Sequence, residues 1–124
     1  MRVLVIDDDE HMRILLRQVM EMAGYEVAVA ENGRQGMELQ RAKPADLVIT
    51  DLIMPEQEGL ETIGTLKKEF AGVKIIAISG GGRIGPEAYL PTAKELGADR
   101  IFVKPFDIQA IRAAARELLG HGTG

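Results

Sequence analysis

Acidic residues directly follow two short apolar runs of this sequence, and this arrangement constrains the fold more than any other feature. Asp7 and Asp8 follow the run at residues 3–6, and Asp51 closes the run that begins at Asp46. Short runs rich in valine and isoleucine are typical of strands buried on both faces of a parallel sheet. Because open α/β sheets bind ligands at the carboxyl ends of their strands, we expect the three carboxylates to lie together at such a site.

Two further strand-like runs end in residues that suit the same site. The run from Val73 ends in the hydroxyl of Ser79, and the run at residues 100–103 is followed by Lys104. Mg²⁺ prefers hard oxygen ligands, and Mn²⁺ is an alternative with the same preference. An aspartate oxygen can attack phosphorus, while a lysine ammonium and a bound cation offset charge on the transferred group. The strand ends therefore predict a site for a divalent cation and a phosphoryl group.

Strand-like runs alternate five times with segments of helical periodicity. We expect strands at residues 2–6, 25–30, 46–50, 73–79 and 100–103, and helices at 10–23, 33–42, 60–70, 86–96 and 108–119. This alternation predicts a parallel sheet with right-handed crossovers and helices on both faces. The size fits a flavodoxin-like, doubly wound α/β fold, for which we expect the strand order 2-1-3-4-5. Residues 1–120 would form one domain and residues 121–124 a flexible tail, with no output domain attached.

The composition argues against several classes of function. The 124 residues include no cysteine, which excludes disulfides, zinc–thiolate sites and thiol catalysis. A net charge of −4 argues against a nucleic-acid partner. No apolar run approaches the ~18 residues of a membrane span, and no signal-peptide pattern is present. We therefore expect a cytoplasmic protein without a membrane partner.

The chain resembles the receiver domain of two-component response regulators along nearly its whole length. The matching motifs are Val5-Ile6-Asp7-Asp8, Val48-Ile49-Thr50-Asp51-Leu52-Ile53-Met54-Pro55, Gly59, Ile76-Ala77-Ile78-Ser79-Gly80, Gly97-Ala98-Asp99 and Val103-Lys104-Pro105-Phe106. The resemblance implies a signalling protein that takes a phosphoryl group from the phosphohistidine of a histidine kinase or histidine phosphotransfer domain. It implies catalysis only of its own phosphorylation and dephosphorylation, and a downstream protein target that the sequence does not identify.

The resemblance also assigns roles to the acidic residues. Asp51 would be the phosphoacceptor. Asp8 and Asp51 would bind Mg²⁺ directly, together with the backbone carbonyl of Ile53, and Asp7 would bind it mainly through water. Gly59 is expected to allow a backbone turn before the third helix.

Further residues are expected to contact the phosphoryl group or the phosphodonor. Ser79 and Lys104 would contact the phosphoryl group; a cis Lys104–Pro105 bond would aim the lysine inward, and the sequence leaves the isomer open. Met12 lies in the first helical turn after the acidic pair, and Phe106 follows Pro105. Met12 and Phe106 should border the site. We expect Met12, Pro105 and Phe106 to dock the phosphodonor protein.

The sequence departs from the family pattern between the fourth strand and the lysine. Many receivers carry an aromatic switch residue three positions before the lysine, where this chain has Ile101. Phe102 comes one place later and should point to the other face of the strand. Pro91 lies inside the expected fourth helix and should kink or delay it. We therefore expect an intact phosphoryl site whose response acts mainly through residues 79–96.

Three other interpretations of the sequence remain open. A protein–protein adaptor that signals without phosphate is the main alternative, although the complete acidic set and Lys104 favour the phosphoacceptor. Residues 80–85 match the glycine pattern of a dinucleotide site, but Asp99 stands before its strand rather than at its end, which favours a loop. His11 fits a solvated residue of the first helix better than a phosphorelay group or a metal ligand.

Overall fold

Five parallel strands form a single sheet in the computed structural model, which describes residues 1–52, 58–79 and 90–120. The strands are β1 (Arg2–Ile6), β2 (Glu26–Ala30), β3 (Leu47–Asp51), β4 (Lys74–Ser79) and β5 (Arg100–Val103). Their order is β2-β1-β3-β4-β5, and every neighbouring pair is parallel. The fold class and strand order predicted from the sequence are therefore confirmed.

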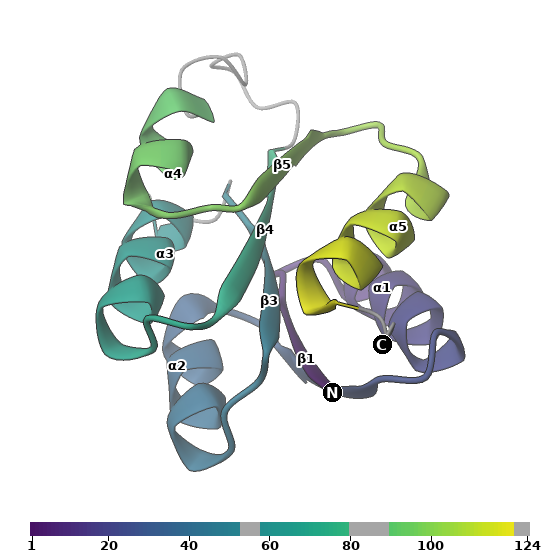
Figure 1. The fold of residues 1–124 in the computed structure, drawn as a ribbon, viewed down its shortest axis with the longest axis horizontal. Coiled ribbons are helices and arrows are strands. Elements are labelled where there is room, and N and C mark those ends of the chain that lie inside the picture. The colour runs from purple at the N-terminus through teal and green to yellow at the C-terminus, as the bar shows by residue number, and fades with distance from the viewer. Residues whose placement is uncertain (53–57, 80–89, 121–124) are drawn as a thin grey trace.

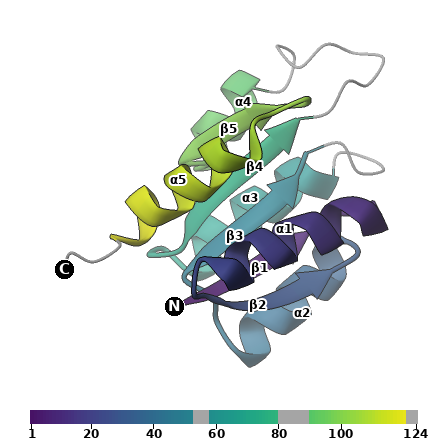
Figure 2. The same ribbon diagram turned by 90° about the vertical axis from the view of Figure 1, so that its right-hand side faces the viewer.

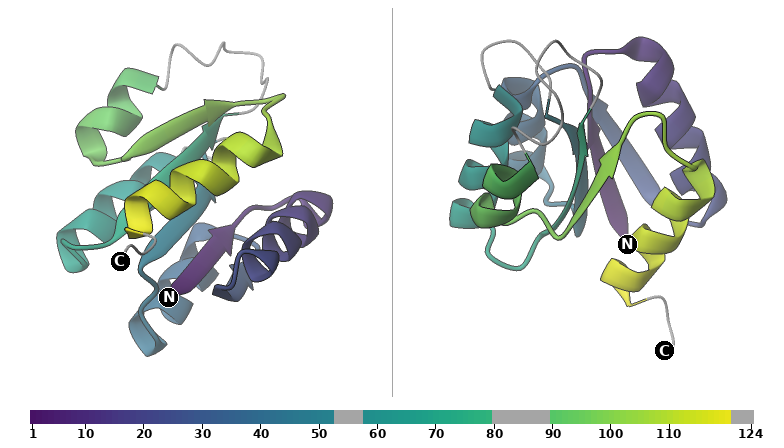
Figure 3. Two further views of the ribbon diagram at one scale, coloured as in Figure 1. Left: turned by 45° about the vertical axis from the view of Figure 1, so that its right-hand side comes forward. Right: turned by 90° about the horizontal axis from the view of Figure 1, so that it is seen from above.

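Helices cover both faces of the sheet. They are α1 (Glu10–Met22), α2 (Gly33–Ala42), α3 (Glu58–Glu69), α4 (Leu90–Leu96) and α5 (Ile108–Leu119). Figure 1 shows α1 and α5 on one side of the sheet and α2, α3 and α4 on the other. The turned view of Figure 2 places α1 and α5 in front of the strands, and Figure 3 shows the three layers from above. In the described part of the chain, no helix is long and apolar enough to span a bilayer.

Polar residues at the helix ends explain why several helices begin and end where they do. The side chains of Asp9, Asn32 and Asp107 each accept a hydrogen bond from a backbone N–H of the first turn of α1, α2 and α5. Such caps satisfy donors that have no partner within the helix. Gly120 ends α5 in the left-handed conformation, with φ of 70°, which glycine adopts without strain.

The core consists of two apolar layers, one on each side of the sheet. Residues 3–6 of β1 are at most 1% exposed, and every residue of β3 is buried, as expected for central strands of a parallel sheet. On β5, Ile101 packs into the layer under α2, α3 and α4, whereas Phe102 packs into the layer under α1 and α5. The predicted opposite orientation of these two side chains is confirmed.

The element boundaries differ from the sequence prediction in a few places. The carboxyl end of β3 includes Asp51, and α3 begins at Glu58. The described part of α4 begins at Leu90 and includes Pro91. The predicted helical residues 86–89 and the predicted tail at 121–124 lie outside the described residues.

Candidate functional site

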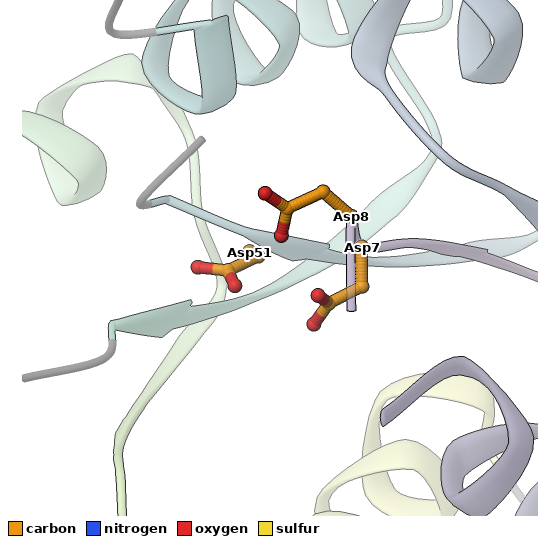
Figure 4. Close-up of side chains that lie close together, drawn as sticks. All are labelled: Asp7, Asp8 and Asp51. Atoms are coloured by element: carbon orange, nitrogen blue, oxygen red, sulfur yellow. The ribbon is translucent and has the colours of Figure 1, made fainter. Parts of the chain in front are cut away.

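The register of β1 and β3 brings the three predicted aspartates together. Ile6 is paired with Thr50, so Asp7 and Asp51, one position further along, emerge side by side. Asp7, Asp8 and Asp51 each offer a carboxylate oxygen within 4.8 Å of the other two (Figure 4). Asp7 is 1% exposed and Asp51 is 4% exposed, whereas Asp8 is open to solvent. The cluster therefore has a buried base and an open side.

Residues from β4 and β5 complete this edge of the sheet. Nζ of Lys104 lies 3.4 Å from Oδ2 of Asp51. The backbone N–H of Lys104 donates to the carbonyl oxygen of Ser79 over 2.9 Å, and the Lys104–Pro105 peptide bond is cis. Oγ of Ser79 is buried and has no hydrogen-bond partner among the described residues. A buried hydroxyl normally has a partner, so this donor is available to a bound group.

Burial perturbs the titration of Asp7. The pKa of Asp7 is raised from its ordinary 3.8 to about 6, mainly by burial and also by the neighbouring Asp51 carboxylate. The hydrogen bond that the N–H of Asp9 donates to Oδ1 of Asp7 opposes this shift. Oδ2 of Asp7 is buried without a hydrogen-bond partner in the described part of the chain. In the absence of a cation, this carboxylate is therefore poorly compensated.

The three carboxylates fit a hard divalent cation. They crowd within one small volume, one buried oxygen lacks a partner, and carboxylate oxygens are the ligands that Mg²⁺ prefers. A cation would offset the mutual repulsion of the three groups. Mn²⁺ shares the preference for oxygen. Ile53, whose backbone carbonyl was predicted as a further ligand, lies outside the described residues.

Arg13, which was not predicted from the sequence, supports the acidic pair. Nη1 of Arg13 donates to the backbone carbonyl of Asp7 over 2.7 Å, and Nη2 lies 3.8 Å from Oε1 of Glu31. Its side chain is only 14% exposed. The arginine thus ties the residues after β1 to those after β2. The signal in the sequence was a basic residue one turn into the helix that follows the acidic pair.

Gly59 allows α3 to approach the end of β3 closely. A Cβ atom at this position would lie 2.5 Å from the carbonyl oxygen of Asp51 and 2.6 Å from Cα of Leu52. Gly59 was expected at a backbone turn before the third helix, but it lies within the helix, so that expectation was wrong. Glycine is needed here because a side chain would collide with the backbone that carries the predicted phosphoacceptor.

An apolar groove borders the acidic cluster between α1 and the start of α5. Met12, Leu15, Lys104, Pro105 and Phe106 line it, and its volume is about 430 Å³. We call these five residues the rim groove. It brings together the three predicted docking residues, although their docking role remains a prediction. Leu15 is 40% exposed and lines the groove as well.

Comparisons with known proteins place this arrangement in a family. Residues 3–116 match the response regulator receiver domain. Sporulation initiation phosphotransferase F of Bacillus subtilis is 33% identical over 118 residues, which cover 95% of this chain and 93% of that protein. The chemotaxis protein CheY of Thermotoga maritima is 39% identical over 106 residues, covering 85% of this chain and 86% of that protein.

A solved structure agrees with these sequence matches. A CheY-like response regulator receiver domain protein of Methanospirillum hungatei superposes with a TM-score of 0.87 at 26% identity, covering 97% of this chain and 94% of that one. The chain therefore belongs to the response regulator receiver domain family of two-component signalling. Members of this family are signalling domains that interact with histidine kinases or phosphotransfer proteins.

Proposed function

We propose that this domain accepts a phosphoryl group on Asp51 from the phosphohistidine of a histidine kinase or histidine phosphotransfer domain. One observation carries the proposal: the buried Asp51 carboxylate lies between the ammonium of Lys104, at 3.4 Å, and two further carboxylates that fit a divalent cation. The name of the Bacillus relative, a phosphotransferase, agrees with this chemistry. A domain with such donors would act in the cytoplasm.

The transfer requires little of the protein beyond positioning and charge. A carboxylate oxygen of Asp51 attacks phosphorus, the new P–O bond forms, and the P–N bond breaks with its electron pair going to the donor imidazole. The ammonium of Lys104 lies where it can offset charge on the phosphoryl oxygens, and the unpartnered hydroxyl of Ser79 can donate to one of them. A bound Mg²⁺, held by Asp8 and Asp51 with Asp7 nearby, would supply further positive charge at those oxygens.

The proposed response to phosphorylation acts through the segment that follows β4. Ser79 is the last residue of that strand, and a phosphoryl oxygen that engages its hydroxyl would act directly on the backbone leading to residue 80. Ala77 is paired with Ile101, which packs beneath α2, α3 and α4. Since isoleucine lacks a ring and a hydroxyl, it can respond only by repacking. Residues 80–89, on which most of this proposal falls, lie outside the described residues.

Labelling with acetyl phosphate and Mg²⁺ tests the proposal. Wild-type protein should gain a hydroxylamine-labile phosphoryl group, visible by intact mass. Asp51→Asn should remain unlabelled, because an amide keeps the shape but is not a competent nucleophile. Asp46→Asn is the matched control, since Asp46 is exposed at the start of β3, away from the cluster. Full labelling of the Asp51 variant would reject Asp51 as the acceptor, and an unlabelled wild type would favour the adaptor function.

A further inference from the structure

Two arginines on α5 lie on one helix face and line a pocket outside the phosphoacceptor site. Arg112 and Arg116, together with Gln109 and Ala113, surround a pocket of about 210 Å³. These positions are spaced i, i+3, i+4 and i+7, which places them on one side of the helix. We call the pair formed by Arg112 and Arg116 the α5 arginine pair.

The α5 arginine pair has no acidic partner in the described part of the chain. Ion pairs there engage five other arginines, namely Arg2, Arg13, Arg17, Arg41 and Arg100. Glu117, which neighbours Arg116 in sequence, is paired with Arg100 on β5. Within residues 1–52, 58–79 and 90–120, both arginines thus have no carboxylate partner, although the net charge of the chain is −4.

One nitrogen of the pair is both buried and unsatisfied. Nε of Arg112 has no hydrogen-bond partner among the described residues. Buried N–H groups in native proteins are nearly always paired, and those of charged groups are the most costly to leave unpaired. Two like charges one helical turn apart also weaken a helix slightly. Both features are understandable if a group from outside the chain completes the site.

The pair lies along the helix that starts at the rim groove. Phe106 lines the groove, and α5 begins two residues later, so Arg112 and Arg116 follow at roughly 6 and 12 Å along the axis from Ile108. Figure 2 shows α5 at the surface beside α1, on the face of the sheet that these helices cover. A protein that covers the rim groove to reach Asp51 therefore needs to extend by only the length of a short helix to contact the α5 arginine pair.

We infer that the α5 arginine pair binds an acidic segment, rich in Asp or Glu, of the phosphohistidine protein that docks at the rim groove. This inference rests on the proposed function. The guanidinium fork matches a carboxylate in shape and charge. A nucleic acid is disfavoured, because two arginines beside Glu117 on an acidic chain are a small electrostatic footprint. Charge complementarity at the edge of an apolar contact sets specificity and association rate.

Phosphotransfer profiling with the full chain tests the inference. Each histidine kinase of the host is autophosphorylated with labelled ATP, and the kinase that labels the wild type fastest becomes the probe. The double variant Arg112→Glu/Arg116→Glu, which we call the glutamate variant, should lower kcat/KM for transfer from that kinase at least tenfold. Labelling by acetyl phosphate should stay within twofold of wild type. The wild-type rate should also fall more steeply with added salt than that of the variant.

Two further variants separate binding from folding. Arg34→Glu is the matched control for charge, because Arg34 is an exposed arginine on α2, on the opposite face of the sheet, and has no ion pair among the described residues. It should retain wild-type transfer. Changing Arg112 and Arg116 to glutamine keeps helix propensity and should give an intermediate loss. Substituting arginine for acidic residues on the probe kinase should restore transfer to the glutamate variant.

The outcomes separate this inference from the proposed function. If neither the kinases nor acetyl phosphate label the wild type, the proposed function fails and this inference fails with it. If the probe kinase labels the wild type and the glutamate variant equally, the inference alone is overturned. Equal loss with both donors would overturn it as well, since that result means damage to the phosphoacceptor site. If the glutamate variant transfers normally and differs from the wild type only in nucleic-acid binding or self-association, the α5 arginine pair binds another occupant and the inference is overturned.

Discussion

Lys104 and Asp51 are 53 residues apart in sequence, yet Nζ of the lysine lies 3.4 Å from Oδ2 of the aspartate. The lysine side chain is 27% exposed and the aspartate side chain 4% exposed, so the pair spans the boundary between core and solvent. β5 and β3 are separated by β4, and their parallel alignment brings the two side chains to the same edge. The ammonium is thus beside the predicted phosphoacceptor before any phosphoryl group arrives.

Lys104→Gln should slow labelling by acetyl phosphate at least tenfold, because the ammonium that offsets charge on the phosphoryl oxygens is lost. The affinity for Mg²⁺ should rise several-fold, since a positive charge 3.4 Å from a proposed ligand is removed. Calorimetric Mg²⁺ titration and labelling kinetics measure the two effects. Lys94→Gln, on the exposed part of α4, is the control. Unchanged labelling would contradict the role assigned to Lys104.

Asp7→Asn should make the metal-free protein more stable at pH 7.5 and less sensitive to pH. Because the folded-state pKa of Asp7 is raised from 3.8 to about 6, its stabilising effect is fully present below pH 3.8 and is lost as pH rises through about 6. The loss should be on the order of 3 kcal/mol. Urea unfolding at pH 3.5 and 7.5 with a chelator measures most of it. The same dependence on pH in the wild type and the variant would show that Asp7 is not its source.

Arg13→Ala should weaken Mg²⁺ binding several-fold and lower the free energy of unfolding by about 1–2 kcal/mol, because the carbonyl of Asp7 loses a charged donor. Arg13→Lys should keep part of the Mg²⁺ affinity and part of the stability that Arg13→Ala loses. Arg17→Ala is the matched control, since Arg17 lies one turn later in α1 in an exposed pair with Glu21. A loss of stability without any change in Mg²⁺ affinity would show that Arg13 does not position the acidic pair.

Gly59→Ala should lower the free energy of unfolding by about 1–3 kcal/mol and slow phosphorylation, because the added methyl group would collide with the backbone of Asp51 and Leu52. Gly64→Ala is the control in the same helix. Its added methyl group would meet only Cδ2 of Leu96 at 3.6 Å, so the better helix propensity of alanine should make it neutral or stabilising. Thermal unfolding and labelling kinetics compare the two. Equal stability of both variants would refute the steric account.

Met12→Asp should impair phosphotransfer from a histidine kinase at least tenfold, because it puts a charge into the apolar rim groove. Labelling by acetyl phosphate should be spared, since a small donor needs no docking surface. Met22→Asp, on the strongly exposed end of the same helix, is the control. If Met12→Asp loses both kinase transfer and acetyl phosphate labelling, the phosphoacceptor site is damaged. That result would contradict a docking role for the rim groove.

Local patterns in the sequence were sufficient to predict the architecture and the acidic cluster. The apolar runs closed by Asp7 and Asp51 mark buried parallel strands, and parallel strands necessarily present their carboxyl ends at one edge. Alternation with helical segments then leaves few arrangements of five strands. For the same reason, the opposite orientation of Ile101 and Phe102 follows from the two-residue period of a strand.

Contacts between elements that are distant in sequence were decided only by the tertiary structure. Periodicity indicates which face of a helix is apolar, but not which neighbour it meets, so only the packing shows that the apolar Leu15 is 40% exposed. The hydrogen bond from Arg13 to Asp7 depends on how α1 leaves the sheet, and the need for Gly59 depends on how closely α3 packs against β3. The sequence by itself determined the strands and the chemistry at their ends, whereas the strand order was expected only from the fold class. Packing decided which charges are paired, including that Arg112 and Arg116 have no acidic partner among the described residues, because pairing depends on distances that only the assembled layers set.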